Sequence, residues 1–332
     1  MNTKSKRTVF CPSCSSRCIQ WGFSSTSTKR YRCCGCGKTF RAFQKRAGMQ
    51  RPFLWYFEQY ILYGETYAAL SRWSGYSIRY LEAQCTKLLL KQPPPLQIPQ
   101  SIEQETYLIL DGRWFGKRIC LMLYRQSKSK LILHASFMPK EYGSLILKNL
   151  QELDQKGYHF TAIVSDGGTG IKKAVVKMYG AIPHQICMAH MHRQATNSLG
   201  KYPKERHMRQ LKSLADHMWL IESKEARQWW KEQVNDWIKT HGLYLGATRW
   251  DTKGNWWYIH SGARKSVRAM KTAYEECFRF LDHPLMPKTT NEMEATIGTL
   301  SMKHLIHRGM RRERLQQFIA WYIYFYNKKL LP

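Results

Sequence analysis

The chain has 332 residues, enough for two or three domains, and its 43% hydrophobic and 13% aromatic content can build a sizeable core. Its 53 Lys and Arg residues against 23 Asp and Glu residues give a formal net charge of +30, so a compact chain repels itself unless it binds a polyanion such as nucleic acid. No run of 18 apolar residues exists, and residues 1–8 lead into Cys11 without an apolar segment, so we expect neither a membrane span nor a secretory signal. The ten cysteines are therefore expected to be reduced in the cytoplasm, where metal binding is commoner than disulfide formation.

Four cysteines near the N-terminus give the strongest local signal. Cys11 and Cys14 form one C-x2-C pair, and Cys33 and Cys36 form a second pair after 18 intervening residues. This spacing is typical of a structural zinc site, because each pair directs two thiolates at one tetrahedral ion. We therefore predict a zinc ribbon over residues 1–48, and the eleven Lys and Arg residues in positions 1–50, with no Asp or Glu, make duplex phosphate its expected partner.

A helix-turn-helix is predicted over residues 49–92. Gly75 suits the tight turn between two helices, and each helix starts at a suitable cap, Thr66 or Ser77. The second helix would then be the recognition helix, and the positive charge favours DNA binding over the alternative of an ordinary helical hairpin. The residues expected to face bases or phosphates are Arg79 and Tyr80.

A proline-rich linker is predicted over residues 93–102, because its prolines exclude helix and favour extended chain. After it, apolar runs lead to Asp111 and to Asp166, and such short runs are typical of buried strands. Both carboxylates are therefore expected at strand ends. Two further strands and a helix lie between them, and another helix follows, so the predicted order is β-β-β-α-β-α. This is the order of an RNase H-like α/β fold, whose adjacent and parallel first and fourth strands make the two aspartates neighbours.

The predicted core has two parts, residues 103–199 and residues 287–332, separated by an all-α insertion over residues 200–286. Seven of the twelve Trp residues lie between Trp219 and Trp257, and we expect core packing to be commoner than base stacking for each of them. The second part of the core carries a third carboxylate, Glu294, on a predicted helix.

Asp111, Asp166 and Glu294, on this order of elements, look like the DDE triad of cut-and-paste transposases. More narrowly, the chain resembles the Mutator-type (MULE-like) transposases of bacterial insertion sequences. Members of that group carry a C-x2-H signature after the second Asp, an N-x-x-E placing the Glu and, in several members, a basic tripeptide after it. The matching motifs are Ile109-Leu110-Asp111-Gly112, Val164-Ser165-Asp166-Gly167, Cys187-Met188-Ala189-His190, Thr290-Asn291-Glu292-Met293-Glu294 and His307-Arg308-Gly309.

The resemblance implies cleavage and transfer of DNA strands by two Mg²⁺ ions, or Mn²⁺, held by the three carboxylates, with Asp111 bridging both ions. It further implies that Cys187 and His190 support the active site and that Arg308 contacts DNA. The implied partners are the double-stranded terminal inverted repeats of a transposon and a target duplex, bound by a homodimer or larger assembly in the bacterial cytoplasm, at the nucleoid and away from membranes.

Each motif also has a structural interpretation. The Asp-Gly pairs at residues 111 and 166 suit plain turns, and Asn291 with Glu294 has capping-box spacing. Cys187 and His190 suit core positions or half of a metal site. For the whole chain the alternatives are a non-catalytic DNA-binding regulator derived from a transposase, and an RNase H-type nuclease acting on RNA–DNA hybrids. The presence of all three carboxylates favours an enzyme over the regulator, and the insertion with the two DNA-binding attachments argues against the hybrid nuclease.

Overall fold

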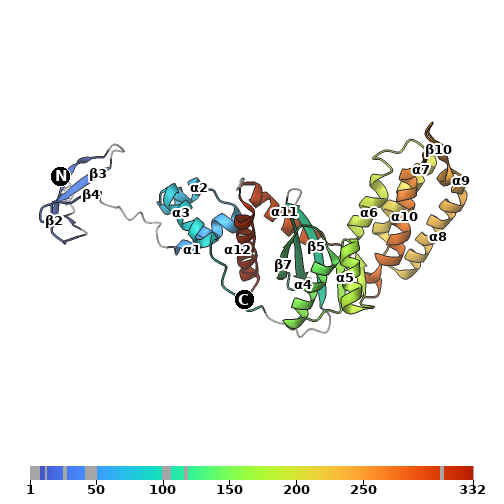
Figure 1. The fold of residues 1–332 in the computed structure, drawn as a ribbon, viewed down its shortest axis with the longest axis horizontal. Coiled ribbons are helices and arrows are strands. Elements are labelled where there is room, and N and C mark those ends of the chain that lie inside the picture. Colours follow the sequence, from blue (N-terminus) through green and yellow to red (C-terminus); the bar gives the residue numbers. More distant parts are fainter. Residues whose placement is uncertain are drawn as a thin grey trace, which may run out of the picture. The chain divides into compact units, whose positions relative to one another are not determined.

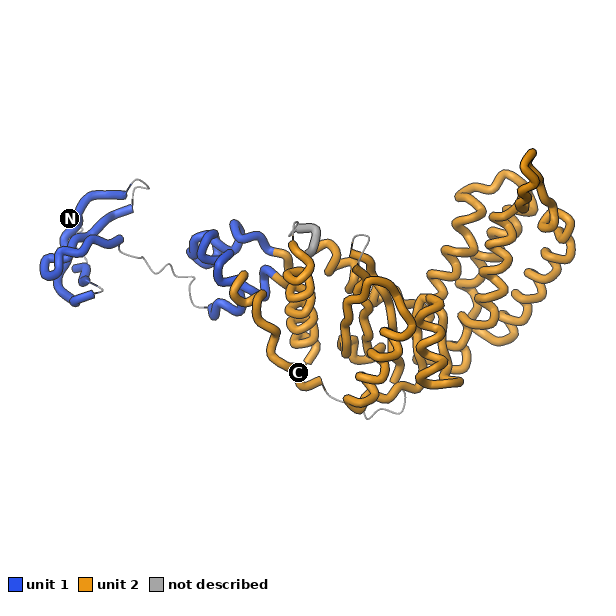
Figure 2. The backbone as a smooth tube through the Cα atoms, viewed as in Figure 1, with its two compact units in different colours: residues 1–60, 65–85 blue, residues 61–64, 86–332 orange. Residues whose placement is uncertain are grey.

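The computed structural model forms two compact units, which are coloured separately in Figure 2. Unit 1 comprises Met1–Tyr60 and Glu65–Cys85, and unit 2 comprises Ile61–Gly64 and Thr86–Pro332. The structure describes residues 8–11, 13–24, 28–41, 51–98, 106–115, 119–306 and 310–331. Among these residues, no helix has the length and apolar character needed to cross a membrane.

The N-terminal part of unit 1 is a four-stranded antiparallel sheet (Figure 1). Its strands, in spatial order, are β1 (Val9–Phe10), β2 (Arg17–Phe23), β3 (Lys29–Cys33) and β4 (Thr39–Arg41). So small a sheet buries little apolar surface, and its core consists of cysteines with a few flanking side chains. The core residues are Cys11, Cys18 and Cys33, flanked by Val9, Tyr31 and Phe40.

Residues 53–89 are helical, as predicted. The elements are α1 (Phe53–Glu58), a π-helical turn (Gln59–Tyr63), α2 (Tyr67–Ser74) and α3 (Ile78–Leu89). Both predicted caps are confirmed, since the Thr66 hydroxyl accepts the Ala69 N–H and the Ser77 hydroxyl accepts the Tyr80 N–H, each at 3.2 Å. Gly75 has a φ of +74° at the end of α2, a conformation that glycine adopts without strain. DNA binding by these helices stays a prediction.

Unit 2 is built around a five-stranded mixed sheet of order β7-β6-β5-β8-β9 (Figure 1). The three consecutive strands β5 (Tyr107–Phe115), β6 (Ile119–Gln126) and β7 (Ile132–Met138) pair antiparallel, as predicted. The fourth strand, β8 (Ala162–Ser165), pairs parallel with β5, and β9 (His184–Ile186) pairs parallel with β8. The predicted adjacency of the first and fourth strands is therefore confirmed.

Helices cover both sides of this sheet. The apolar residues of α4 (Gly143–Gln155) and α5 (Thr169–Tyr179) join those of β5, β6 and β8 in one buried cluster. The C-terminal helices are α11 (Asn291–Ile306), which packs against β5, and α12 (Arg312–Leu330), which packs against β7. The Asn327 side chain on α12 accepts the Ile132 N–H and donates to the Ile132 carbonyl, which ties α12 to β7.

The prediction that a strand ends at Asp111 is wrong. β5 continues to Phe115, because its antiparallel pairing with β6 extends to Phe115 opposite Ile119. Its parallel pairing with β8 stops one residue before the aspartate, at Leu110 opposite Ser165. Asp111 therefore lies within a strand, at the point where the neighbouring strand has ended.

The prediction of an all-α insertion is also wrong, because the insertion contains a β-hairpin. α6 (Met188–Asn197) precedes the insertion, whose helices are α7 (Arg206–Asp216), α8 (Lys224–Thr240), α9 (Gly242–Gly246) and α10 (Ser261–Glu276), with short 3-10 turns at His217–Leu220 and Arg279–Leu281. The hairpin pairs β10 (Thr248–Trp250) with β11 (Trp256–Tyr258). Its turn forms because the Asp251 carboxylate accepts the N–H groups of Lys253 and Asn255, and Gly254 takes a φ of +80°.

The seven tryptophans of the insertion divide into two groups. Trp230 and Trp237 are buried, and each indole N–H donates to a backbone carbonyl of α7, as expected for core packing. The other five are exposed, contrary to that expectation: Trp219, Trp229, Trp250, Trp256 and Trp257.

Candidate active site and zinc site

The four predicted zinc ligands lie together in the N-terminal sheet. The sulfur atoms of Cys11, Cys14, Cys33 and Cys36 all lie within 4.8 Å of one another. The Sγ–Sγ distances are 3.6 Å between Cys11 and Cys36 and 3.3 Å between Cys14 and Cys33. Four convergent sulfur donors fit the tetrahedral coordination of a structural zinc ion.

Backbone N–H groups point at these sulfurs. The Cys11 sulfur accepts the Ser13 N–H at 3.4 Å, and the Cys33 sulfur accepts the N–H groups of Gly35 and Cys36 at 3.3 Å each. Several hydrogen bonds, the largest contribution coming from the Ser16 backbone, lower the pKa of Cys14 to about 6. Such hydrogen bonds stabilise thiolates, the form of cysteine that binds metal.

Asp111 lies within β5 and Asp166 just beyond the end of the adjacent β8, and the backbone that follows each aspartate holds its carboxylate. An Asp111 oxygen accepts the Gly112 N–H at 2.9 Å, and an Asp166 oxygen accepts the Gly168 N–H at 2.9 Å. Asp111 is buried, with 5% of its surface exposed, whereas Asp166 directly follows β8 and is partly buried. The turn after Asp166 depends on Gly167, whose φ is +80°.

Glu294 brings the third carboxylate to the same place from the first turn of α11. Its Oε1 accepts a hydrogen bond from Arg193 at 2.8 Å and lies 3.7 Å from Nε2 of His190, both on α6. α11 begins at Asn291, and the N–H groups of Met293 and Glu294 bond to the Thr290 carbonyl, so Asn291 is the first helical residue and not the cap.

Glu292 has different surroundings from Glu294. Its carboxylate accepts a hydrogen bond from Arg125 at 2.9 Å, and that arginine is buried, with 2% of its side chain exposed. Residues two apart on a helix point about 200° apart. The pairing of Glu292 with Arg125 therefore leaves Glu294 as the glutamate that faces Asp111.

The electrostatics show that the three carboxylates interact. Burial, with a further contribution from the charges of Asp166 and Glu294, raises the pKa of Asp111 to about 7, while His190 opposes this shift. Within the described residues, however, the four cysteines are the one group of three or more potential ligands whose donor atoms lie close enough to hold one ion. The carboxylates are gathered, but Glu294 is engaged with Arg193 instead of forming a compact oxygen cluster.

Cys187 joins the elements that carry these groups. Its sulfur accepts the backbone N–H of Thr290 at 3.3 Å and the Thr290 hydroxyl at 3.5 Å, which links it to the start of α11. Its own N–H donates to the Ser165 carbonyl, immediately before Asp166. A hydrogen bond with Cys187 is also the largest cause of the raised pKa of His190. Cys187 thus links Ser165, His190 and Thr290.

Two neighbours of the site were not predicted. Arg193 has one sequence signal, because it follows His190 by three residues and so shares its helix face. Glu141 has none: it precedes α4, yet a Cβ placed on Gly112 would lie 2.9 Å from one of its carboxylate oxygens and a Cβ on Gly168 would lie 3.5 Å from the other. A fourth carboxylate therefore lies against the glycines that follow both aspartates.

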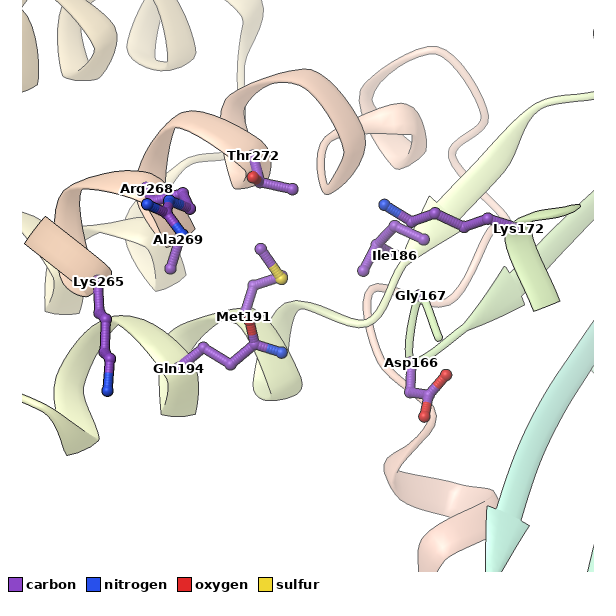
Figure 3. Close-up of a pocket in the computed structure, with 10 residues that line it drawn as sticks. All are labelled: Asp166, Gly167, Lys172, Ile186, Met191, Gln194, Lys265, Arg268, Ala269 and Thr272. Atoms are coloured by element: carbon purple, nitrogen blue, oxygen red, sulfur yellow. The ribbon is translucent and has the colours of Figure 1, made fainter. Parts of the chain in front are cut away.

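A cavity of about 350 Å³ opens beside Asp166 (Figure 3). One side comes from the loop after β8 and from α5, and the other comes from α6 and α10. Lys172 in its lining pairs with Glu276, whereas Lys265 and Arg268 of α10 have no ion-pair partner among the described residues. The insertion therefore places two uncompensated cations across the cavity from a candidate catalytic carboxylate.

Two of the three predicted DNA-contacting residues, Arg79 and Tyr80, lie on α3. Arg79 is exposed on the first turn of α3, and Tyr80, 43% exposed, has its ring 4.8 Å from that of Tyr76. Arg308 lies outside the described residues. Contact of these three residues with DNA stays a prediction.

Comparison with known proteins gives a family match. The profile described as "Transposase IS66 family" matches residues 126–314, more than half of the chain, a segment that contains Asp166 and Glu294 but not Asp111. IS66 is a different family from the Mutator-type group, so the Mutator-type assignment is not supported. No curated protein matches the chain.

One similar solved structure is the cryo-EM structure of a simian T-cell lymphotropic virus intasome in complex with PP2A regulatory subunit B56 gamma. The sequence identity is 17% and the TM-score is 0.21, and the match covers 49% of this chain and 67% of that chain. A TM-score this low supports no inference about this chain.

Proposed function

Because the chain belongs to the IS66 family of transposases, we propose that it binds the terminal inverted repeats of a transposon and cleaves and transfers DNA strands by a DDE mechanism. The observation that carries this proposal is the parallel pairing of β5 with β8 up to Leu110 opposite Ser165, which brings Asp111 and Asp166 together. The helix that carries Glu294, α11, packs against β5. We interpret the β7-β6-β5-β8-β9 sheet as an RNase H-like core, with residues 200–286 as its insertion.

The residues proposed to hold Mg²⁺ are Asp111, Asp166 and Glu294. Carboxylate oxygens are the ligands that Mg²⁺ prefers, and the raised pKa of Asp111 reflects burial and negative charge that a bound cation would offset. When bound, Mg²⁺ neutralises charge on a phosphodiester and lowers the pKa of an attacking hydroxyl. The four N-terminal cysteines are proposed to hold a structural zinc ion.

The surrounding side chains support this chemistry. Arg193 and His190 lie beside Glu294 and balance its charge, while the ion pair of Glu292 with Arg125 fixes the rotation of α11. We assign to Lys265 and Arg268 the binding of a DNA phosphate next to Asp166, since both are uncompensated cations on the cavity wall. The N-terminal ribbon and helices 53–89 would hold the DNA ends.

The test is cleavage of duplexes that carry the inverted repeats flanking the gene. The wild-type chain should cut them in Mg²⁺ and not in EDTA, and Asp111→Asn should remove the cutting while leaving binding of the same duplex within about twofold. Binding without any Mg²⁺-dependent cutting by the wild-type chain would instead support the DNA-binding regulator.

A further inference from the structure

The N-terminal sheet has two chemically different faces. Directly paired residues of neighbouring strands share a face, and alternate residues along a strand change face. The pair Cys18–Cys33 and the pair Gln20–Tyr31 define the face that packs on the cysteine cluster. The opposite face, here called the Arg–Trp face, carries Phe10, Arg17, Ile19, Trp21, Arg32 and Arg41.

The Arg–Trp face leaves large apolar side chains in water. Phe10 is 62% exposed, Ile19 49% and Trp21 48%. The strands are too short to fold over these side chains, and the core of the ribbon lies on the other face. Three such residues on one face of a small sheet mark a binding surface more than scattered exposed residues do.

The charge of this face indicates which class of molecule it can bind. Arg17, Arg32 and Arg41 are all exposed, and residues 1–50 contain no Asp or Glu. The Arg32 guanidinium lies over the Trp21 ring, 4.8 Å from its centroid, so a cation and an aromatic ring are in direct contact on this face. Such a surface complements a polyanion that also offers flat apolar groups.

We propose that the Arg–Trp face binds unpaired bases of a DNA strand, with Trp21 and Phe10 stacking on bases and the arginines contacting phosphates. The inference rests on the proposed function, because DNA is the substrate of that function. Base–aromatic stacking in single-strand binding proteins has this combination of aromatic rings and cations. A duplex offers its phosphates but keeps its base faces stacked inside, so it would leave Trp21 and Phe10 unused. Unpaired bases therefore fit this face better than the duplex phosphate expected from charge alone.

The experiment is photo-cross-linking of the full chain to a short single strand containing 5-iodouracil, followed by peptide mapping. We expect cross-links within Arg17–Phe23, and we expect Trp21→Ala and Phe10→Ala each to reduce their yield by about fivefold or more, from the roughly 1–3 kcal/mol of one base stack. Trp21→Phe should retain most of the yield. The matched control is Phe23→Ala: Phe23 is 58% exposed on the same strand, but its pairing with Lys29 after the bulge places it on the cysteine side.

Three outcomes would overturn the inference. The first is cross-linking that maps only outside the ribbon, and the second is an equal loss from Phe23→Ala and Trp21→Ala. The third is an equal yield for the single strand and for the same sequence annealed into a duplex. Zinc content of each variant checks that the ribbon is folded, and if Trp21→Ala loses zinc, Phe10→Ala decides. Asp111→Asn should cross-link like the wild-type chain. If the wild-type chain cross-links but never cleaves, the proposed function is defeated and this inference stands.

Discussion

Two glutamates in the first turn of α11 have opposite surroundings. Glu294 faces His190 and Arg193, whereas Glu292 pairs with the buried Arg125. We expect Glu294→Gln to reduce Mg²⁺-dependent cleavage by more than the roughly 10- to 100-fold that loss of an outer-shell partner costs. Glu292→Gln should stay active, because an amide oxygen can still accept from Arg125. Cleavage rates and end binding, measured side by side, check this.

The control for this prediction is Asp111→Asn. If Glu292→Gln is inactive and Glu294→Gln is active, the third ligand has been assigned to the wrong glutamate. If both glutamate variants are active and Asp111→Asn is not, the third ligand is another carboxylate. Glu141 is then the first candidate, because of its position beside Gly112 and Gly168.

Glu292 also has a structural role that can be measured without DNA. Removing its carboxylate leaves the Arg125 guanidinium, whose side chain is 2% exposed, with its bond to the Lys130 carbonyl as the one remaining hydrogen bond to a described residue. Glu292→Ala should therefore lower the free energy of unfolding by about 1–3 kcal/mol, the usual penalty for an unsatisfied buried polar group. Glu292→Gln should lower it less. Urea unfolding followed by circular dichroism measures both, and equal stabilities of wild type and Glu292→Ala would contradict the role given to this pair.

At the scale of elements, two faces of α10 line two separate cavities. Lys265 and Arg268 line the cavity beside Asp166, while Lys271 lines a separate cavity with Trp230 and Tyr274. Replacing Lys265 or Arg268 with Glu should weaken DNA binding and reduce the slope of log K against log salt by about one per lost phosphate contact. Lys271→Glu makes the same change of charge on the other face and is the matched control. Equal losses from all three variants would mean that only overall charge matters.

The strands that lead to the two aspartates and the helices of residues 53–89 were predictable because their signals are local. The apolar runs before Asp111 and Asp166 and the caps at Thr66 and Ser77 depend on a few adjacent residues. The end of β5 was not predictable, since it depends on pairing with β6, a separate segment. The hairpin after α9 was not predicted, because its tryptophans were interpreted as core residues of helices. The hairpin depends instead on the turn in which the Asp251 carboxylate accepts the Asn255 N–H.

The candidate site divides in the same way. Asp111, Asp166 and Glu294 were identified from motifs whose order suggested a common site, and their electrostatic contact agrees with that expectation. Arg193 had only helical spacing to suggest it, and Glu141 had no signal, because its position near both aspartates arises solely from the path of the chain before α4. Metal-binding and catalytic roles stay predictions for all of them.

At the scale of the whole molecule, the zinc site should determine whether the ribbon folds. So few buried side chains cannot stabilise the ribbon, and structural zinc supplies much of the folding free energy of such modules. Freshly purified chain should contain about one zinc, and Cys14→Ser should lose it together with part of the DNA-end affinity. Elemental analysis measures the metal, and less than about half a zinc per wild-type chain would contradict the assignment.

The net charge of +30 leads to the last prediction, which concerns the chain as a whole. Many of the cations are spread over the ribbon, the helices after it and the insertion, so a DNA end should contact several phosphates at once. Each neutralised phosphate releases counterions, and six to ten contacts lower the affinity by about 10³- to 10⁵-fold between 50 and 200 mM salt. Titrations across this range should give a straight, steep line of log K against log salt. A flat line would mean that the positive charge serves something other than DNA. Any DNA binding that remained would then depend on interactions such as base stacking on the Arg–Trp face, which respond little to salt.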